Sequence, residues 1–415
     1  MVALIILGSV ALLIWLGILL HPARPWDFRP VGEDDPSPLE PAVWPAVCAL
    51  VPARNESETL PQTLPALLTQ DYPGELTVIV IDDRSQDGTA ATAHNVAAQA
   101  GAADRLQVLA GANLPEGWVG KVWALEQGTA WCSLASSNNS RLPQSYHSPA
   151  AFRPPPYLLL TDADIHHAPR SLRRLVAESE AGRFALNSRM ARLRCVSGPE
   201  RLLIPPFVFF FNLLYPMRWI NDRTNLVAAA AGGCVLLAAP ALERIGGFAC
   251  ISDKIIDDVN LARQVKNLGE SIQLALSRSE VQSLRRYESL TAIWTMVRRT
   301  AFTELQYSWI RLVGTVLGLI LMFLVPPLLF VGGIGLVLGS VAGWSMTPPV
   351  WALVLAGQGL CTWGLMAVVY RPAVLFFGLS RLWSVTLPLA GLLYGAMTVD
   401  SALRYLVGKR TTWRD

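Results

Sequence analysis

The sequence predicts an α/β domain with a mostly parallel sheet, placed between two apolar regions that span a membrane. The first observation is composition: 52% of the 415 residues are hydrophobic and 16% are charged, whereas about 25% charged residues are usual in soluble proteins. The second is the presence of long apolar runs near both ends of the chain. The third is a middle region in which short apolar stretches alternate with helical ones.

The N-terminal apolar run extends from Val2 to Leu20, which is about the length that crosses a bilayer core. It lacks a basic n-region and a small-residue cleavage site, so we expect a retained transmembrane anchor over residues 1–21 rather than a cleaved signal peptide. Arg24 and Arg29 follow the run, and nothing basic precedes it. The positive-inside rule therefore predicts that the next segment is cytoplasmic. Residues 22–45 are rich in proline and are predicted to form a linker.

The soluble domain is predicted over residues 46–305, and it opens with a β-α-β-α order. This order favours a mostly parallel sheet with helices on both faces. Ligands of such sheets bind at the carboxyl ends of the strands. The elements expected in turn are strand Val47–Val51, helix Leu60–Leu68, strand Leu76–Ile81, helix Thr89–Ala100 and strand Tyr157–Asp164.

Polar clusters follow the first two of these strands. Arg54 and Glu56 lie in P-A-R-N-E after the first strand, and Asp83 lies in D-D-R-S-Q-D-G-T after the second. Each cluster taken alone is compatible with a turn or a helix cap. Because both fall at strand ends, together with a third cluster, we expect a shared nucleotide site. In it Asp83 accepts hydrogen bonds from the base or ribose, and Arg54 and Glu56 line the same end.

The third cluster is the T-D-A-D that closes the strand expected at Tyr157–Asp164. Residues i and i+2 of an extended backbone point to the same side. Asp162 and Asp164 are therefore expected to converge on one hard cation, Mg²⁺ or Mn²⁺, which would bridge the phosphates of a nucleotide. His166 and His167 follow closely and are considered as additional ligands.

Taken in order, P-A-R-N-E, I-D-D-R-S-Q-D-G-T, G-K-V-W-A-L-E-Q-G and T-D-A-D resemble the successive motifs of glycosyltransferase family 2. The resemblance covers roughly residues 46–300. It implies an inverting enzyme with a GT-A fold that uses a nucleotide sugar, such as a UDP-sugar, and a divalent metal. By position, it implies nucleotide contacts for Asp83, Lys121 and Asp162, and metal binding by Asp162 and Asp164.

A second acidic motif, I-I-D-D-V-N-L-A at Ile255–Ala262, follows a small-residue strand and a G-G-F turn, as in the resembled family. An inverting transfer needs a carboxylate that accepts the proton of the acceptor hydroxyl. The resemblance implies that Asp258 is this general base, with its neighbour Asp257 as the alternative. The competing interpretation is that either carboxylate only caps the following helix.

Two further segments admit two interpretations each. Arg201–Trp219 is rich in Phe and broken by prolines, which is compatible with buried core or with an interfacial element that brings the site to a lipid acceptor. Ile293–Phe302 lies where processive members of the family carry Q-x-x-R-W. Here Arg298 and Arg299 match only the arginine, and they either neutralise the leaving diphosphate or lie at lipid headgroups.

Apolar sequence returns over residues 312–400, where about three spans are predicted, and a basic tail follows at 401–415. Counting spans from a cytoplasmic domain places the C-terminus outside, whereas the basic tail favours the cytoplasm. A re-entrant hairpin, or a break of the first run at Pro326-Pro327, would resolve this conflict. The three runs are Gly314–Trp344, Val350–Tyr370 and Leu382–Val399.

The whole layout resembles the bacterial hopanoid-biosynthesis-associated glycosyltransferases. That resemblance implies a multi-pass protein of the bacterial inner membrane, with its catalytic domain on the cytoplasmic side and a polycyclic isoprenoid lipid as acceptor. Carotenoid glycosyltransferases, a processive polysaccharide synthase and a non-catalytic membrane scaffold are the alternatives. The intact set of carboxylates argues against the scaffold.

Charge and cysteine content argue against a nucleic-acid-binding protein and against a zinc site. The net charge is only +3 and no basic block occurs, so the sequence gives no reason to expect a nucleic-acid partner. The six cysteines are scattered without a C-x-x-C pair, which favours thiols in a reducing compartment over a zinc site. The sequence specifies neither the sugar, nor the nucleotide, nor the oligomeric state.

Overall fold

The computed structural model describes residues 1–30, 38–132, 153–344 and 348–408. Much of the basic tail predicted at 401–415 therefore lies outside the described residues, as do residues 133–152, whose polar and proline-containing sequence predicts an inserted loop. The chain divides into two compact units, which we call the helical unit and the sheet unit. The helical unit combines Met1–Phe28, Cys195–Pro216 and Tyr287–Arg410, and the sheet unit contains Arg29–Arg194 and Met217–Arg286.

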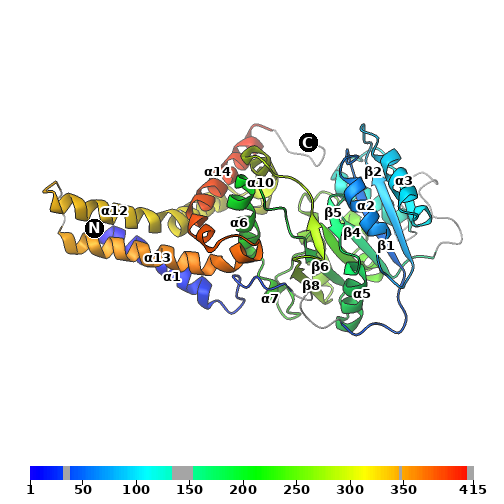
Figure 1. Cartoon of the computed structure of the whole chain (residues 1–415), viewed down its shortest axis with the longest axis horizontal. Coiled ribbons are helices and arrows are strands. Elements are labelled where there is room, and N and C mark those ends of the chain that lie inside the picture. Colours follow the sequence, from blue (N-terminus) through cyan, green and yellow to red (C-terminus); the bar gives the residue numbers. More distant parts are fainter. Residues whose placement is uncertain (31–37, 133–152, 345–347, 409–415) are drawn as a thin grey trace. The chain divides into compact units, whose positions relative to one another are not determined.

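The sheet unit is built on a seven-stranded sheet with the order β3-β2-β1-β4-β7-β6-β8 (Figure 1). β1 pairs in parallel with β2 and β4, and β2 pairs in parallel with β3, whereas β7 runs antiparallel to β4 and β6. The prediction of a mostly parallel α/β sheet is confirmed. The strands are β1 (Val47–Ala53), β2 (Leu76–Asp82), β3 (Leu106–Ala110), β4 (Tyr157–Thr161), β6 (Leu186–Met190), β7 (Cys234–Ala238) and β8 (Ile272–Leu276).

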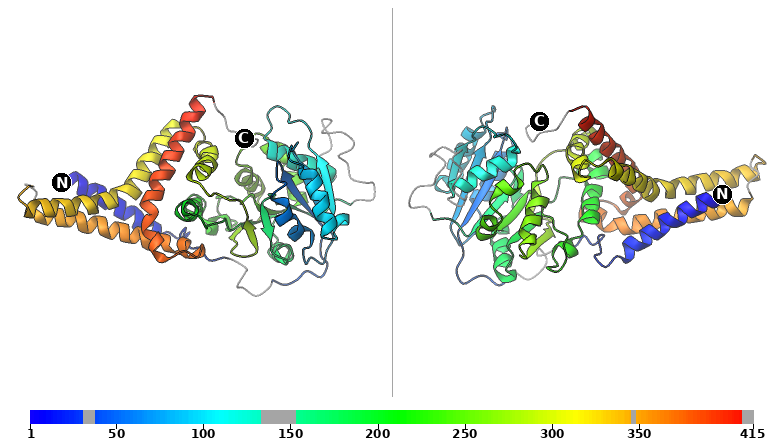
Figure 2. Two further views of the ribbon diagram at one scale, coloured as in Figure 1. Left: turned by 45° about the horizontal axis from the view of Figure 1, so that its top comes forward. Right: turned by 180° about the vertical axis from the view of Figure 1, so that it is seen from behind.

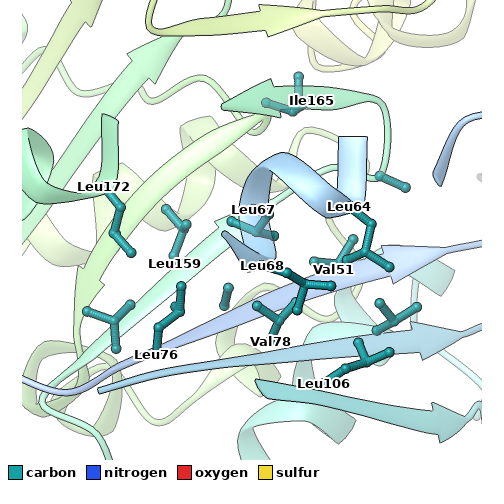
Figure 3. Close-up of a cluster of buried hydrophobic side chains, with 14 of the residues drawn as sticks. Val51, Leu64, Leu67, Leu68, Leu76, Val78, Leu106, Leu159, Ile165 and Leu172 are labelled. Atoms are coloured by element: carbon teal, nitrogen blue, oxygen red, sulfur yellow. The ribbon is translucent and has the colours of Figure 1, made fainter. Parts of the chain in front are cut away.

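Helices cover both faces of this sheet, which explains why β1 is buried at every position. Alternate side chains of β1, including Val51, pack with Leu64 and Leu68 of α2 in the core shown in Figure 3. On the opposite face, Leu50 lies against α4, where a Cβ atom added to Gly128 would approach within 2.9 Å of the Leu50 side chain. The helices are α2 (Leu60–Leu68), α3 (Thr89–Gln99), α4 (Gly120–Trp131), α5 (Ser171–Gly182), α7 (Met217–Ile220), α8 (Ala239–Arg244) and α9 (Asp257–Asn267).

A second, two-stranded sheet follows the central strand. Its strands β5 (Ile165–His167) and β9 (Val281–Ser283) pair antiparallel, with Ile165 opposite Ser283. β4 ends at Thr161, and the D-A-D that follows is a turn in which Ile165 N–H donates to the Asp162 carbonyl. The expectation that an extended strand carries both aspartates to one side is therefore wrong, because the backbone turns between them.

In the described part of the helical unit, four helical segments are long and apolar enough to cross a membrane. They are Val2–Leu20, Trp309–Val341, Pro349–Phe376 and Arg381–Leu406. The run containing Pro326 and Pro327 does not split into two passes. It continues from α11 (Trp309–Leu319) through a π-helical turn at Ile320–Leu324 into α12 (Val325–Val341). The remaining helices are α1 (Val2–Leu20), α6 (Gly198–Leu214), α10 (Leu290–Glu304), α13 (Pro349–Phe376) and α14 (Leu387–Leu406).

Helices α12 and α13 lie side by side (Figure 2), and glycines at their contact allow the two backbones to approach closely. A Cβ atom at Gly333 would lie 2.5 Å from the Ala356 backbone nitrogen, and one at Gly359 would lie 2.4 Å from the Phe330 nitrogen. Apolar attraction between helices is weak in lipid, so close backbone packing of this kind supplies much of the association.

Helix α1 is bound to this unit by polar contacts as well. The Gln358 side chain of α13 donates to Ser9 Oγ at 2.9 Å. Trp15 is fully buried and its indole N–H donates to the Met322 carbonyl at 3.0 Å. Pro326 has no N–H to offer that carbonyl. The Trp15 indole therefore supplies the Met322 carbonyl with a hydrogen bond that Pro326 does not provide.

The segment expected at Arg201–Trp219 divides between the two units. Its first part is α6, a helix that tolerates Pro205 and Pro206 and buries Leu203 and Phe209 within the helical unit. The second part, α7, belongs to the sheet unit. Burial of α6 favours the core interpretation of its Phe-rich sequence over the interfacial one.

Candidate functional site

The loops after β1 and β2 are joined by hydrogen bonds at the carboxyl edge of the sheet. Asn55 N–H donates to Ser85 Oγ, and Gln86 N–H donates to Asn55 Oδ1, each at 2.9 Å. Asn55 and Arg84 adopt left-handed backbone conformations, with φ of 54° and 59°, which non-glycine residues seldom do. These loops are thus held in one specific arrangement.

Asp83 is buried beside these loops and is bound by Arg54. It is 2% exposed, and the Arg54 guanidinium donates to its carbonyl at 3.1 Å and to its Oδ2 at 3.3 Å. Arg54 and Asp83, which the sequence placed in separate motifs, are therefore direct partners. A buried carboxylate beside a guanidinium can accept hydrogen bonds from a sugar hydroxyl or a base.

The neighbouring Asp87 has a structural role. Its carboxylate accepts hydrogen bonds from Ser57 N–H at 2.9 Å and from Thr89 N–H at 3.1 Å. Desolvation opposes its charge, but the bonds from Thr89 and Ser57 outweigh it and lower the pKa of Asp87 to about 2. Asp87 thus links the start of α3 to the first loop, although the cap position of α3 is Gly88 and no side chain caps the helix there.

Lys121 connects the two acidic motifs of the chain. Its Nζ lies 2.8 Å from Asp162 Oδ1 and 3.5 Å from Asp257 Oδ2. Burial disfavours its charge, but Asp162 and Asp257 offset this and raise the pKa of Lys121 above its ordinary value. The lysine is therefore a permanent cation between the D-A-D turn and the start of α9. The residues around it form a small hollow lined by Pro52, Leu125, Leu160, Thr161, Asp162, Gly232, Val235, Asp257, Asp258 and Leu261.

Asp164 faces a different set of partners. Ser283 Oγ donates to its Oδ2 at 2.5 Å, and Arg285 Nε lies 3.6 Å from the same oxygen. Arg285 also reaches Glu56, with 3.0 Å between Nη2 and Oε1. Sequence reasoning missed Ser283 and Arg285, because only the pairing of β9 with β5 brings them beside the D-A-D turn.

The carboxylates of Asp162 and Asp164 supply two hard oxygen ligands of the kind that Mg²⁺ and Mn²⁺ prefer. Among the described residues, no group of three or more His, Cys, Asp or Glu side chains is placed to hold a metal ion. Two carboxylates are too few ligands for such an ion, so a metal there would need further oxygens from a bound diphosphate or water, and the metal-binding role of these aspartates stays a prediction. His167 is buried and bonded through Nε2 to Thr161 Oγ1 at 2.9 Å, and burial lowers its pKa to about 4.

Asp258 is held by main-chain donors. Gly232 N–H donates to its Oδ2 and Val259 N–H to its Oδ1, each at 2.8 Å. The residue before α9 that occupies the cap position is Ile256, and no side-chain capping bond is present there. Asp258 therefore binds the loop before β7 with one oxygen and accepts a first-turn N–H of its own helix with the other. Burial, followed by the negative charge of Asp257, raises the pKa of Asp258 to about 6.

Arg298 and Arg299 belong to α10 of the helical unit. Arg298 Nη1 lies 3.4 Å from Asp400 Oδ2 on α14, and Trp294 Nε1 donates to the same oxygen at 2.8 Å. Arg299 is exposed. Arg298 thus has a partner within its own unit, which accounts for its position without a ligand.

The sheet unit is similar to a known protein family. Residues 48–245 match the family model described as Glycosyl transferase family 2. This part of the chain is therefore similar to glycosyltransferase family 2 domains. No curated protein sequence matches the chain.

Solved structures similar to this chain include two glycosyltransferases. A mannosyltransferase from Pyrobaculum calidifontis, solved with GDP-Man and Mn²⁺, is 17% identical with a TM-score of 0.51, over 98% of this chain and 99% of that one. The glucosyl-3-phosphoglycerate synthase of Mycobacterium tuberculosis, solved with Mg²⁺ and UDP, is 17% identical with a TM-score of 0.38, over 63% of this chain and 79% of that one. The predicted GT-A fold is confirmed by the first of these.

Proposed function

We propose that this glycosyltransferase moves a single sugar from a nucleotide-diphosphate donor, such as a UDP-sugar, to a lipid acceptor with inversion at the anomeric carbon. The observation that carries the proposal is the cluster in which Lys121 joins Asp162 to Asp257, beside Asp258, on a GT-A domain. The same chain contains four helices that are apolar enough to cross a membrane. An acceptor dissolved in the bilayer is the substrate class that suits this combination.

The donor would bind along the carboxyl edge of the sheet. Arg54, Glu56 and Asp83 would contact the base and ribose, and Lys121 and Asp162 would lie at the diphosphate. Asp162 and Asp164 would hold Mg²⁺ or Mn²⁺. When bound, this metal supplies positive charge that stabilises the leaving diphosphate.

The acceptor hydroxyl would give its proton to Asp258 while its oxygen bonds to the anomeric carbon and the bond to the diphosphate breaks. A base works best when its pKa lies near the working pH, and burial raises the pKa of Asp258 to about 6. The N–H groups of Gly232 and Val259 hold one lone pair on each carboxylate oxygen and so fix its orientation. Asp257 contributes its charge and its ion pair with Lys121.

The acceptor is proposed to be a hopanoid or related polycyclic isoprenoid, at the cytoplasmic side of a bacterial inner membrane. The layout of anchor, domain and C-terminal helices supports this proposal, as does the orientation suggested by Arg24 and Arg29 after α1. The processive alternative is less favoured, because Met296 and Thr300 stand where the processive motif has Gln and Trp.

The test is transfer of radiolabel from a panel of nucleotide sugars by membranes that contain the protein, with and without an added hopanoid alcohol. We expect a product with one sugar that partitions into organic solvent and requires Mg²⁺ or Mn²⁺. Membranes with the Asp258→Asn variant provide the matched control. Water-soluble polymer as the main product would replace the proposal with the synthase, and label on carotenoid alone would change the acceptor.

A further inference from the structure

The Arg285 side chain connects two motifs that lie far apart in the sequence. Its guanidinium is 3.0 Å from Glu56 Oε1 in the loop after β1 and 3.6 Å from Asp164 Oδ2 in the D-A-D turn. Arg285 is the second residue after the end of β9 at Ser283. One cation therefore balances two carboxylates at the edge of the sheet where the donor is proposed to bind.

Ser283 holds Asp164 from the same segment, but in a different way. It is 6% exposed, and it lies opposite Ile165 in the β5–β9 pair, which fixes its hydroxyl beside Asp164. Leu284 N–H donates to the Asp164 carbonyl at 2.9 Å, so the main chain is fixed as well. A buried hydroxyl on a paired strand has little freedom to leave its partner.

The Arg285 side chain, in contrast, is exposed enough to move away from Asp164. Its side chain is 49% exposed, whereas that of Asp164 is 10% exposed. Ion pairs of exposed arginines contribute little to stability, so an exchange of partners costs little. A divalent cation at Asp164 would also repel the guanidinium, because both carry positive charge and compete for the same oxygen.

We propose that Ser283 is a positioning residue for the metal-binding carboxylate Asp164, and that Arg285 is a tethered counter-charge that leaves Asp164 when metal binds and contacts the donor's diphosphate. This inference rests on the proposed function. The planar guanidinium forms paired hydrogen bonds with phosphate oxygens. Arg285 thereby neutralises Asp164 in the metal-free protein and the diphosphate in the loaded one, and this exchange makes metal and nucleotide bind together.

The test is calorimetry on the full-length protein in detergent, with MnCl₂ alone and then with UDP in the presence of MnCl₂. For Arg285→Gln the two affinities should move in opposite directions. Mn²⁺ alone should bind more tightly because a competing cation is gone, and UDP with Mn²⁺ should bind about 10- to 100-fold more weakly because charge-assisted bonds are lost. A purely structural role would weaken both.

Ser283→Ala should behave differently, since it removes a bond that orients a ligand. We expect Mn²⁺ affinity measured with UDP present to fall about 10- to 100-fold, while UDP affinity without metal stays unchanged. Arg183→Gln is the matched charge control. Arg183 precedes β6, whose start lies at the opposite edge of the sheet from the end of β4, so neither affinity should change.

The outcomes separate this inference from the proposed function. Unchanged UDP affinity in Arg285→Gln, or weaker binding of Mn²⁺ alone, overturns the role of Arg285. Unchanged Mn²⁺ affinity in Ser283→Ala overturns the role of Ser283. A wild-type protein that binds neither UDP nor GDP with Mn²⁺ would instead count against the proposed function itself.

Discussion

The main-chain N–H of Gly232 donates a 2.8 Å hydrogen bond to Oδ2 of Asp258. A Cβ atom at Gly232 would lie 3.0 Å from Lys121 Nζ and 3.3 Å from that same carboxylate oxygen. Because Gly232 has no side chain, both Lys121 and Asp258 can lie against the main chain at this position. This contact joins the strand and the second acidic motif, and it fixes the carboxylate on which the proposed chemistry depends.

The first prediction concerns the general base. Asp258→Asn keeps the size of the side chain but removes the proton acceptor, so turnover should fall about 10²- to 10⁴-fold. UDP affinity and melting temperature should hardly change, and both are measured on the same preparation. Asn caps helices about as well as Asp, so near-normal turnover would show that Asp258 is not the base. If Asp257→Asn is the inactive variant, the role moves to that residue.

The pH dependence of transfer gives an independent test of the same carboxylate. A base must be unprotonated, and burial and Asp257 raise the pKa of Asp258 to about 6. kcat/KM should therefore rise as pH increases through about 6 and level off above it. In Asp257→Asn a neighbouring negative charge is lost, so the pKa of Asp258 should fall and the acid limb should move to lower pH. An acid limb that stays in place would contradict the assignment.

The two carboxylates of the D-A-D turn predict coupling between the binding of metal and the binding of nucleotide. Asp162 and Asp164 offer two ligand side chains, and a diphosphate adds oxygens and charge that favour a divalent ion. UDP should therefore bind more tightly with Mn²⁺ than without it, and Asp164→Asn should abolish this difference in calorimetry. Equal UDP affinity for the wild type with metal, the wild type without metal and the variant would remove the metal from the proposal.

Trp15 predicts a stability effect in the helical unit. Trp15→Phe keeps the aromatic contact with Phe323 but leaves the Met322 carbonyl without its donor, which should cost about 1–3 kcal/mol. Unfolding in detergent measures the loss. Trp351→Phe, at an exposed tryptophan of α13, should cost much less. Equal losses in the two variants would show that the indole N–H contributes nothing specific.

The ion pair between Arg298 of α10 and Asp400 of α14 allows a test of whether Arg298 stabilises the helices or binds the leaving diphosphate. If Arg298 holds the helices together, Arg298→Gln and Asp400→Asn should each destabilise the helical unit, with a coupling of about 1 kcal/mol in a double-mutant cycle. UDP affinity should not change. Arg299→Gln is the matched control for stability alone, because Arg299 is exposed. Reduced UDP affinity at unchanged stability would assign Arg298 to the leaving diphosphate instead.

Much of the sheet unit could be predicted because its strands and helices are marked by short, local sequence patterns. Burial on both faces makes β1 and β2 continuous apolar runs, and the polar residues that follow them mark the strand ends. The same logic failed at the D-A-D, where an apolar run gave no sign that the strand stops at Thr161. A turn and a strand end differ in backbone dihedrals, and the short sequence Thr161–Asp164 is compatible with both.

By itself, the sequence determined the order of anchor, α/β domain and apolar helices, and it named the carboxylates Asp162, Asp164, Asp257 and Asp258. Only the tertiary structure decided which groups face them. Ser283 reaches Asp164 through the β5–β9 register, and Lys121 reaches Asp257 across the sheet edge. Such contacts depend on strand pairing between segments more than a hundred residues apart in the chain. A linear pattern records periodicity and local turns, but pairing is set by the packing of the whole domain.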